Sequence, residues 1–574
     1  MERRDTLIAS LHEAEASSGA QWVSPESLAG LRKRYGLTKA AVRGIASYYS
    51  MLSLRPRGRH VIRLCTSPVC RMMGSLDLLD LLETELGIGL GQTDASGFFT
   101  LETTQCLGRC AGAPAMMLDS LVFGGLDIDR VRYILGEVRS GRASGDPESA
   151  AEHIGSAEGP RIALRHLSLS DPADIGEYRR AGGYDAFRLA LARDPRELID
   201  EFERAKVRGR GGAGFPAGLK ERSTAATECD EECERYVVCN ADEGEPGTFK
   251  DRIIMEREPH LLLEGMLISG WAIGARRGYL YVRGEYGLSI ERLGAAIAAA
   301  RTAGLLGEKI LGSDFSFDVE LRRGAGSYLC GEELTLIESL EGKRGYPRIK
   351  PPFPAESGLW GKPTLVNNVE TLAELPWVVE HGADEYLRLG TPSSPGTKIF
   401  CVSGDVAHPG YGEWELGVPL GSLVAAAGGL RGGGRPAAVL LGGAAGTFVS
   451  GGSLELPMDY DALRTAGATL GSGAVIVLGP GSDLARTIQA ILDFFEHESC
   501  GKCVPCRVGT ARLAAKARAL VELSASGADG KQKRAALDDM VRDAELIAKT
   551  SLCPLGQSPV LPLRSAQRNV ADLI

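Results

Sequence analysis

The sequence lacks the features that mark several large classes of protein. No apolar run approaches the roughly 18 residues of a membrane span, and the first residues contain no apolar signal segment. Lysine and arginine number 65 against 74 aspartate and glutamate, a net charge of −9. That charge argues against a nucleic acid or an anionic membrane surface as partner. We therefore expect a cytoplasmic protein with no direct membrane span.

What is present is typical of a large globular chain. The chain of 574 residues is too long to fold around a single hydrophobic core, and its length predicts about three to five domains. Hydrophobic residues make up 44% and charged residues 24%, ordinary values for a globular protein. Thirteen cysteines in a chain without a signal segment favour metal ligands and free thiols over disulfides.

A glycine-rich stretch at residues 208–220 is the centre of the predicted chemistry. Glycine has no Cβ, so successive backbone N–H groups can approach a ligand and form a concave anion site. Arg208, Arg210 and Lys220 add positive charge, and Phe215 offers a flat apolar face for a ring. The stretch predicts a site for a phosphorylated, aromatic cofactor.

The same stretch also matches a dinucleotide-binding fingerprint at Gly209, Gly211 and Gly214. That fingerprint requires a strand immediately before it. The preceding residues instead predict a helix, with Asp194 as its cap and Pro195 at its first position. We therefore reject an ordinary Rossmann site, and a flexible glycine linker remains the plain alternative.

Further stretches downstream carry acids and glycines in a specific order. A carboxylate-rich turn at 240–252 follows an apolar run at 236–239, a glycine turn at 324–333 ends in paired acids, and two more motifs occupy 350–354 and 361–368. Carboxylates beside a phosphate-binding loop would repel the phosphate, unless they bind another group such as a flavin edge, ribose hydroxyls or a metal. Together these stretches closely resemble the flavin subunit of the NADH dehydrogenase module of respiratory complex I, from about residue 194 to residue 553. Relatives of that subunit occur in NAD-reducing hydrogenases and NAD-dependent formate dehydrogenases.

Two cysteine pairs precede that region: Cys65 with Cys70, and Cys106 with Cys110. A strand predicted at 59–64 leads to the first pair, and a helix predicted at 75–86 lies between the pairs. The spacing alone leaves zinc open. The residues at 45–50, 57–60 and 106–114 resemble the thioredoxin-like [2Fe–2S] ferredoxin subunit that partners the flavin subunit in complex I. The resemblance implies that the four cysteines hold a [2Fe–2S] cluster.

A third cysteine group lies near the end of the chain. Cys500, Cys503 and Cys506 are spaced C-x2-C-x2-C, and a remote fourth cysteine, Cys553, precedes a proline. This pattern is typical of a [4Fe–4S] site, because three closely spaced thiolates match three corners of a cubane. Residues 496–509 also match the complex I flavin subunit.

The other cysteines have no ligand pattern. Cys229 and Cys233 lie in an acidic insertion and are expected to be surface thiols. Cys239, Cys330 and Cys401 lie in apolar runs and are expected to be buried thiols.

The expected fold is a multidomain α/β chain with a helical C-terminal bundle. Composition and resemblance divide it into a thioredoxin-like [2Fe–2S] domain with N-terminal helices at 1–140, a small, polar linker at 141–160, an FMN- and NADH-binding α/β domain at 161–390, a β-grasp-like (SLBB) domain of short strands at 391–475, and the helical [4Fe–4S] domain at 476–574. Short strands in the SLBB domain are expected at 399–404, 417–420 and 437–443.

The resemblance also implies roles for individual residues. The FMN phosphate and the nearby nicotinamide nucleotide are held by Gly209, Arg210, Gly211, Gly212, Ala213, Gly214, Gly218 and Lys220. The flavin is contacted by Asn240, Asp242, Glu243, Tyr328, Gly331, Glu332, Asn367 and Asn368. The adenine side of NADH is held by Phe215, Lys350 and Phe353. Glu245 and Glu333 lie near the nicotinamide or its ribose, and their catalytic role is positioning, since hydride transfer to flavin needs no protein acid or base.

The implied function is an exchange between NAD(H), FMN and the two clusters. NADH delivers two electrons as hydride, clusters take one at a time, and a flavin does both. The chain has no motif for formate, hydrogen or quinone chemistry, so the terminal substrate acts on another subunit. Two alternatives belong to other classes of protein. One is a relay or scaffold subunit that has lost its flavin, and the intact glycine and acid motifs argue against it. The other is a zinc-stabilised binding protein.

The parent complex is also inferred from resemblance. The fused arrangement resembles most the β subunit of tungsten- or molybdenum-dependent formate dehydrogenase. The diaphorase subunit of NAD-reducing hydrogenase and a fused complex I subunit are the alternatives. The implied partner is a catalytic α subunit with further iron–sulfur clusters and a molybdopterin-type cofactor.

Overall fold

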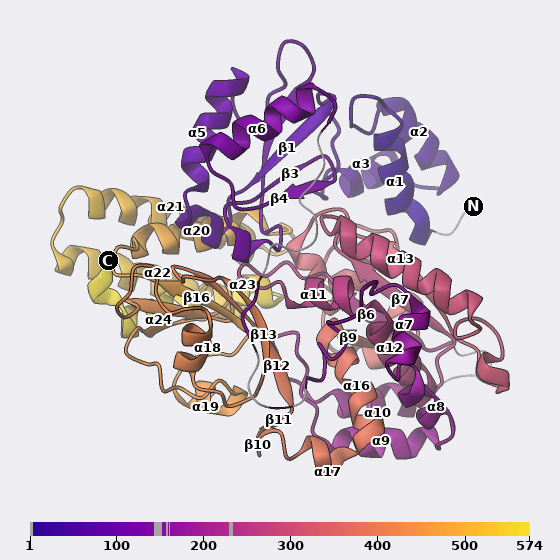
Figure 1. Cartoon of the computed structure of the whole chain (residues 1–574). Helices are drawn as coiled ribbons and strands as arrows, with labels where there is room; N and C mark the ends of the chain where they lie inside the picture. Colours follow the sequence, from indigo (N-terminus) through magenta and orange to yellow (C-terminus); the bar gives the residue numbers. More distant parts are fainter. Residues whose placement is uncertain (1–3, 143–151, 156–158, 160, 229–233) are drawn as a thin grey trace.

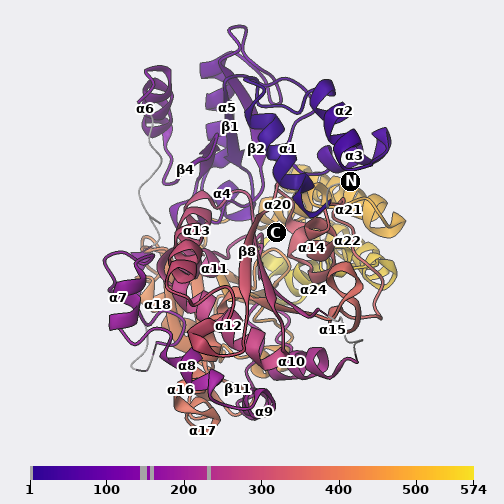
Figure 2. The ribbon, with the colours of Figure 1, turned by 90° about the vertical axis from the view of Figure 1, so that its right-hand side faces the viewer.

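The computed structural model of the chain describes residues 4–142, 152–155, 159, 161–228 and 234–574. Figure 1 shows an N-terminal α/β unit at the top, a large parallel-sheet domain at the lower right, and a second sheet with the C-terminal helices at the left. Figure 2 shows the same N-terminal unit standing above the parallel-sheet domain from the side. Cys229 and Cys233 lie outside the described residues. No helix in the described ranges is both long and apolar enough to cross a membrane.

Three short helices open the chain, as the sequence predicts. After the turn η1 (Arg4–Thr6) come α1 (Leu7–Ala16), α2 (Pro25–Arg34) and α3 (Lys39–Ala46). Ser24 and Thr38 cap α2 and α3, each accepting the backbone N–H three residues later. The apolar side chains of these helices share one core with residues of the parallel-sheet domain, including Tyr279 and Tyr281, whereas the N-terminal sheet has its own core. The helices therefore pack as part of the parallel-sheet domain.

The N-terminal unit is a four-stranded sheet in the order β2-β1-β3-β4. Its strands are β1 (His60–Cys65), β2 (Phe99–Thr104), β3 (Met116–Leu118) and β4 (Leu121–Phe123). Its helices are α4 (Pro68–Met72), α5 (Ser75–Leu86), the turn η2 (Cys110–Gly112) and α6 (Ile128–Arg139). Strands β1 and β2 run parallel, with Cys65 opposite Thr104. Both cysteine pairs therefore follow strand ends at the same edge of the sheet.

The segment after this unit is tied to the second sheet. β5 (Glu152–His153), within the stretch expected as a linker, pairs in parallel with Gly410 and Tyr411. Next, the backbone N–H groups of residues 162–164 all donate to the buried carboxylate of Glu413, at 2.8 to 3.0 Å. One carboxylate thus accepts three hydrogen bonds, which holds the start of the parallel-sheet domain against the second sheet.

The parallel-sheet domain has the strand order β8-β7-β6-β9, with every pairing parallel. The strands are β6 (Tyr236–Ala241), β7 (Arg277–Val282), β8 (Asp318–Arg323) and β9 (Thr364–Asn368). Val, Tyr, Leu and Cys side chains fill β6 and β7 because a parallel sheet covered by helices is buried on both faces. The carboxyl ends of all four strands meet at one edge.

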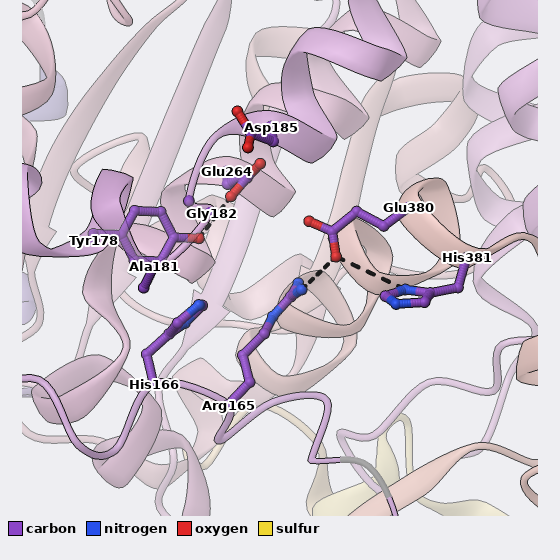
Figure 3. A pocket seen from close by; sticks show the side chains of 10 residues that line it. Arg165, His166, Tyr178, Ala181, Gly182, Asp185, Glu264, Glu380 and His381 are labelled. Carbon is purple, nitrogen blue, oxygen red and sulfur yellow. Dashed lines mark hydrogen bonds and ion pairs between the residues drawn. The ribbon is translucent and has the colours of Figure 1, made fainter.

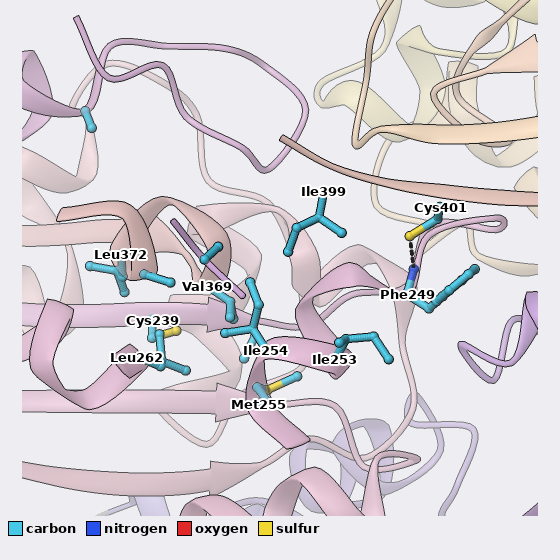
Figure 4. Close-up of a cluster of buried hydrophobic side chains, with 14 of the residues drawn as sticks. Cys239, Phe249, Ile253, Ile254, Met255, Leu262, Val369, Leu372, Ile399 and Cys401 are labelled. Carbon is cyan, nitrogen blue, oxygen red and sulfur yellow. Dashed lines mark hydrogen bonds between the residues drawn. The ribbon is translucent and has the colours of Figure 1, made fainter. Parts of the chain in front are cut away.

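Helices and short turns surround this sheet. They are α7 (Ile175–Arg180), α8 (Asp185–Leu191), α9 (Pro195–Arg204), α10 (Ala217–Ala226), α11 (Lys250–Arg257), α12 (Pro259–Ile273), α13 (Gly287–Thr302), η3 (Ile310–Gly312), η4 (Tyr328–Gly331), α14 (Glu333–Leu340), α15 (Pro354–Ser357), η5 (Leu359–Gly361), α16 (Val369–His381) and α17 (Ala383–Tyr386). The helix predicted from the Asp194 cap is α9, and Asp194 accepts the N–H of Arg196. In the core of Figure 4, side chains of α11, α12 and α16 meet Ile399 and Cys401 from the second sheet, so the two domains share one interior.

The second sheet has the order β15-β14-β16-β12-β13-β5. Its remaining elements are the small hairpin β10 (Gly390–Thr391) and β11 (Ser394–Pro395), the strands β12 (Thr397–Gly404), β13 (Gly410–Glu415), β14 (Ala438–Leu441), β15 (Thr447–Ser450) and β16 (Ala474–Leu478), and the helices α18 (Leu420–Ala426) and α19 (Tyr460–Thr465). The strand expected at 417–420 is wrong. Pro419 has no N–H for a ladder and precedes the first residue of α18, so the segment leads into a helix.

The C-terminal part is helical, as predicted. It consists of α20 (Leu484–His497), α21 (Val504–Ala525), α22 (Gly530–Thr550), α23 (Pro554–Gln557), α24 (Val560–Asn569) and the turn η6 (Ala571–Leu573). Helices α20, α21 and α22 pack in sequence, and α24 packs on β15. Cys503 directly precedes α21 and Cys553 directly precedes α23, and each is followed within two residues by a proline that suits the first helical turn.

Candidate functional site

The predicted loops meet around the carboxyl ends of β6 and β9, a region called the crevice below. From β6 the chain builds β7 and β8 on one side and then returns to add β9 on the other. Open parallel sheets bind ligands at such a reversal, beyond the strand ends. A Cβ on Gly211 of the glycine loop would lie only 3.2 Å from the Cβ of Asn368 at the end of β9. The structure therefore brings the glycine loop, the turn after β6 and the end of β9 together.

The glycine loop is a compact turn between α9 and α10. Gly209 donates its N–H to Phe215 O at 2.8 Å. Gly212 and Gly214 have φ of 122° and 64°, a region that favours glycine. At Gly218 a Cβ would lie 2.6 Å from Glu203 N, so only glycine lets α10 pack this closely on α9. These constraints fix the loop without a ligand.

Arg210 differs from the expectation that its charge adds to an anion site. Its guanidinium is fully buried and makes two hydrogen bonds to Glu374, at 2.7 and 3.0 Å, and one to Tyr386 at 2.9 Å. Its backbone N–H donates to Thr371. The charge is thus compensated inside the protein, because a buried guanidinium requires an ionic partner. Arg210 shapes the loop through these bonds.

Two lysines and two glutamates form an ionic group beside the crevice. Lys350 Nζ lies 2.9 Å from Glu332 and 2.7 Å from Glu333, and Lys220 Nζ lies 3.3 Å from Glu333. Burial acts to raise the pKa of Glu333, but the charges of Lys220 and Lys350 outweigh it and hold the pKa below its ordinary value. Glu333 is therefore ionised at neutral pH.

Three large apolar side chains lie exposed in or directly beside the stretches that the resemblance assigns to the nucleotide. Phe215 is 50% exposed, Phe353 51% and Ile349 69%. Phe215 and Phe353 are the two aromatic residues predicted for the adenine side of NADH. Exposed rings of this kind suit stacking on a planar ligand, because they bury apolar area only when the ligand is present.

Residues predicted for the flavin line the crevice. Asn240 Nδ2 donates to Gly331 O at 2.7 Å, which joins the end of β6 to η4. The carboxylate of Glu243 accepts the N–H groups of Asp251 and Arg252 at the start of α11. Asn367 is buried, and its Nδ2 has no hydrogen-bond partner among the described residues.

The open donor on Asn367 fits a ligand acceptor at this position. A buried donor without a partner costs about 1–3 kcal/mol, so a ligand oxygen or nitrogen there is favourable. A flavin ring carries such acceptors. The residues present therefore fit FMN.

Glu245 lies between the turn after β6, η4 and the second sheet. Its Oε2 accepts the Tyr328 hydroxyl at 2.6 Å, and its Oε1 accepts the Ala445 N–H at 2.9 Å. Burial raises the pKa of Glu245 to about 7. A Cβ on Gly443 would lie 2.5 Å from the Glu245 side chain, so the second sheet closes directly over it. The carboxyl group is fixed in place and titrates near neutral pH.

A buried charge network behind Asn368 was not identified from the sequence. Asn368 Oδ1 accepts Lys250 Nζ at 3.2 Å, and its Nδ2 donates to Asp251 at 2.7 Å. Lys250 also lies 3.0 Å from Glu370, which pairs in turn with Lys398 of β12. The run of charges directly after the turn, at 250–252, is the only sequence signal for it. This network fixes the orientation of the Asn368 amide.

The four N-terminal cysteines are buried and form two pairs. Cys106 Sγ and Cys110 Sγ are 3.7 Å apart. A hydrogen bond from Cys70 lowers the pKa of Cys65 to about 6. Two sulfurs bound at about 2.3 Å to one tetrahedral metal lie about 3.8 Å apart. Two such pairs fit a binuclear cluster in which each iron takes one pair.

The binuclear site is in contact with the parallel-sheet domain. Gly247, in the turn after β6, donates its N–H to Cys110 Sγ at 3.3 Å. Arg71, which directly follows Cys70 in α4, makes a second contact: its Nη1 lies 2.7 Å from Asp493 of α20. Backbone N–H groups that donate to thiolates are a common feature of iron–sulfur sites. These two contacts fix the position of the N-terminal unit against the rest of the chain.

The four C-terminal cysteines come together from two helix starts. Cys500, Cys506 and Cys553 are buried and Cys503 is half-buried. Burial, with the nearby Cys500 and Cys506 thiols, raises the pKa of Cys553 to about 12. Nowhere in the part of the chain that the structure describes do three His, Cys, Asp or Glu side chains converge on a single-ion site. Four thiolates are the ligand set of a [4Fe–4S] cluster, whose corners each take one.

A separate hollow of about 330 Å³ lies away from the crevice (Figure 3). In its lining, Arg165 pairs with Glu380 at 2.6 Å, and the Tyr178 hydroxyl donates to Glu264 at 2.6 Å. None of the residues predicted for the site lines this hollow. We assign it no part in the chemistry.

Three family profiles match the chain in order. Residues 1–139 match the thioredoxin-like [2Fe-2S] ferredoxin family. Residues 202–377 match the Nuo51 FMN-binding domain, and residues 486–574 match the NADH-ubiquinone oxidoreductase-F iron-sulfur binding region. These matches confirm the predicted cofactors: FMN, NAD(H), one [2Fe–2S] cluster and one [4Fe–4S] cluster.

Two curated relatives illustrate the similarity. The NADH-quinone oxidoreductase F 2 subunit of Rhizobium meliloti (strain 1021) is 43% identical over 410 residues, which cover 71% of this chain and 95% of the relative. NAD-reducing hydrogenase HoxS subunit alpha of Cupriavidus necator is 38% identical over 547 residues, which cover 94% of this chain and 86% of the relative. The second relative spans both the N-terminal unit and the parallel-sheet domain.

A solved structure agrees with this arrangement. A chain of NAD+-reducing [NiFe]-hydrogenase in the air-oxidized state superposes with a TM-score of 0.84 at 32% identity, covering 100% of this chain and 93% of that chain. The predicted fold class, a thioredoxin-like unit, an FMN-binding α/β domain and a helical cluster-binding end, is confirmed.

Proposed function

Because the chain belongs to the family of NADH-quinone oxidoreductase F subunits and NAD-reducing hydrogenase alpha subunits, we propose that its crevice binds FMN and NADH through the residues named above. The chain is an NADH-oxidising diaphorase subunit with FMN and iron–sulfur clusters. The observation that carries the site assignment is the convergence of the glycine loop, the turn after β6 and the end of β9 at the reversal of the parallel sheet.

The residues have distinct roles in this proposal. When bound, FMN exchanges a hydride with NADH and single electrons with iron–sulfur clusters. The glycine loop receives the phosphate with backbone N–H groups other than those of Gly209 and Arg210, which bond within the protein, and Asn367 supplies the open buried donor to the flavin. Lys220, Lys350 and the exposed Phe215 and Phe353 receive the nucleotide. Glu245 is positioned by Tyr328 and Ala445 beside the nicotinamide.

The two four-cysteine sets hold the clusters. Cys65, Cys70, Cys106 and Cys110 are the proposed ligands of the [2Fe–2S] cluster. Cys500, Cys503, Cys506 and Cys553 are the proposed ligands of the [4Fe–4S] cluster.

For the parent complex we propose a formate dehydrogenase in which this chain is the β subunit. The fused order of a four-cysteine N-terminal unit and a flavin half supports this proposal. The formate site, a molybdopterin-type cofactor and further clusters then belong to a catalytic α subunit.

The second candidate is an NAD-reducing hydrogenase. It is favoured by the hydrogenase alpha subunit that aligns with 94% of this chain, and by the hydrogenase chain whose structure covers all of it. In both candidates the terminal substrate reacts on a partner subunit.

The isolated chain and its native complex separate these proposals. We expect the isolated chain to oxidise NADH with ferricyanide and to show neither formate nor hydrogen activity. The native complex, purified through a tag on this chain, should reduce NAD+ with formate. Reduction of NAD+ with hydrogen alone would replace the formate proposal by the hydrogenase one. A complex that contains no flavin and no NADH:ferricyanide activity would contradict the diaphorase function itself.

The cysteine sets predict the metal content. A binuclear and a tetranuclear cluster together contain about six iron atoms per chain. We expect this value for protein purified without oxygen, measured by iron analysis against protein concentration. A value near two, or stoichiometric zinc, would show that one of the two sets does not hold its cluster.

A further inference from the structure

One guanidinium connects the backbone of the binuclear site to the backbone of the turn after β6. Arg283 directly follows β7 and is 6% exposed. Its Nη2 donates to the carbonyl oxygen of Cys106 at 2.6 Å, and its Nη1 donates to the carbonyl oxygen of Glu243 at 2.6 Å. Cys106 is a proposed cluster ligand, and Glu243 is a proposed flavin contact. The same side chain therefore hydrogen-bonds to the backbone that carries a proposed cluster ligand and to the backbone that carries a proposed flavin contact.

The contacts around Arg283 make this junction tight. A Cβ on Gly108 would lie 2.2 Å from the Tyr286 hydroxyl, so the loop after Cys106 sits directly on the residue three positions after Arg283. Arg252 Nε donates to Gly108 O at 3.0 Å. Together with the Gly247 N–H on Cys110 Sγ, every contact in this set joins the loop at 106–110 to the parallel-sheet domain. No freely hinged unit is held this way.

The charge of Arg283 is balanced by one acid. Its Nε and Nη2 donate to the two carboxylate oxygens of Glu285, at 3.2 and 2.9 Å. Burial acts to raise the pKa of Glu285, but the charge and hydrogen bonds of Arg283 outweigh it and hold the pKa below its ordinary value. Both groups are therefore charged at neutral pH, and they act in opposite directions on any charge nearby.

We propose that Arg283 is a positioning residue with two effects. It sets the reduction potential of the [2Fe–2S] cluster, with Glu285 as the opposing charge, and it holds the loop at 106–110 against the turn after β6. Adding an electron makes a cluster more negative, so a buried cation beside a ligand favours the reduced form. A buried anion disfavours it. Hydrogen bonds and charges around the ligands are the protein's main means of setting cluster potentials, and they act strongly in a region from which water is excluded.

Three variants test this in the full chain with its cofactors. Arg283→Gln removes the cation, Glu285→Gln removes the anion, and Arg283→Lys keeps the charge but not the forked geometry. The readout is the midpoint potential of the binuclear cluster from its EPR signal during a redox titration. A general structural disturbance would shift the potential in Arg283→Gln and Glu285→Gln without regard to sign, whereas opposite charges predict opposite shifts.

The expected results have definite signs. In Arg283→Gln the reduction equilibrium of the cluster falls about tenfold, which is a shift of about 59 mV to lower potential for a one-electron couple. In Glu285→Gln it rises by a similar factor. Arg283→Lys stays closer to the wild-type value than Arg283→Gln does. Arg132→Gln, which breaks an exposed ion pair with Glu85 between α6 and α5 of the same unit, leaves the potential unchanged.

The outcomes that overturn the inference are equally specific. Shifts of the same sign in Arg283→Gln and Glu285→Gln contradict it, as does an equal shift in Arg132→Gln. An unchanged potential in both Arg283→Gln and Glu285→Gln contradicts it as well. Should Arg283→Gln not fold, Glu285→Gln and Arg283→Lys still carry the test.

The inference rests on the proposed function, and the wild-type control separates the two. Flavin content and the binuclear EPR signal are measured first on the wild-type chain. Their absence there contradicts the cofactor sites themselves. Their presence, with unshifted variants, contradicts only the role of Arg283.

Discussion

Replacing Cys503 by Ala is expected to slow the partner reaction, which is NAD+ reduction by the native complex with the substrate of its partner subunit, at least about a hundredfold. NADH:ferricyanide turnover is expected to stay near the wild-type rate. Loss of groups that merely support metal ligands typically costs about 10–100-fold, and Cys503 is itself a proposed ligand of the [4Fe–4S] cluster. Ferricyanide can draw electrons from the flavin site, which this change does not touch. Cys503 is the half-buried member of its set and directly precedes α21, so its loss disturbs the core least. The measurement compares both activities with flavin and iron content.

A matched control comes from the buried Cys239 in β6, which no ligand pattern includes. Cys239→Ala is expected to keep all iron and both activities. If both activities of Cys503→Ala fell equally with FMN retained, the partner reaction would not depend on the tetranuclear site as proposed. If Cys106→Ala instead abolished the partner reaction with the tetranuclear cluster intact, electrons would pass between the flavin and the partner through the [2Fe–2S] cluster of the N-terminal unit.

Replacing Glu245 by Gln is expected to lower kcat/KM for NADH about ten- to a hundredfold above pH 7 and to leave FMN bound. A hydrogen bond to a charged group contributes about 1.5–3 kcal/mol, which is a factor of this size. Burial raises the pKa of Glu245 to about 7, so the group is neutral below that pH and a carboxylate above it. In the wild type, kcat/KM should therefore rise as pH increases through about 7. In Glu245→Gln the profile should be flat, at the level of the wild type's acidic limb.

Glu333→Gln is the matched control for this pH step. Lys220 and Lys350 hold the pKa of Glu333 below its ordinary value, so Glu333 does not titrate near pH 7 and its variant should keep the step. Burial also raises the pKa of Glu243 to about 7. A step that persists in Glu245→Gln would thus point to Glu243. Loss of flavin together with activity would show that Glu245 is a flavin ligand or a structural residue instead.

Local sequence signals predicted the secondary structure well where they were strong. The cap at Asp194 with Pro195 predicted α9, and the periodic run at 75–86 is α5. The expected strand at 417–420 failed because a short apolar run with a proline looks the same before a strand as before a helix. Composition suggested that 141–160 is a plain linker. It did not indicate β5, because two residues of a strand carry no pattern and their partner, β13, lies far along the chain.

The candidate site was predictable to the level of its loops, but not of its charges. The glycine loop and the acidic turns were found because their residue types are unusual in themselves. Glu374 neutralises the cation of Arg210, and Lys250 and Asp251 hold Asn368. The partners in each of these contacts are more than one hundred positions apart in the sequence. No spacing rule connects such residues. The same holds for Arg283, which in the sequence is one arginine after an apolar strand.

The N-terminal helices share their core with strands of the parallel-sheet domain, and this has a consequence for how the chain is made. Leu7 and Leu11 leave the ribosome first, whereas their core neighbours Tyr279 and Tyr281 follow roughly 270 residues later. At about 5–20 residues per second, that delay is tens of seconds. During this time the apolar faces of α1 to α3 have no native surface to cover them, while the N-terminal sheet can already close around its own core. Folding during synthesis is therefore out of chain order: α1 to α3 are made before the N-terminal sheet but are packed after it.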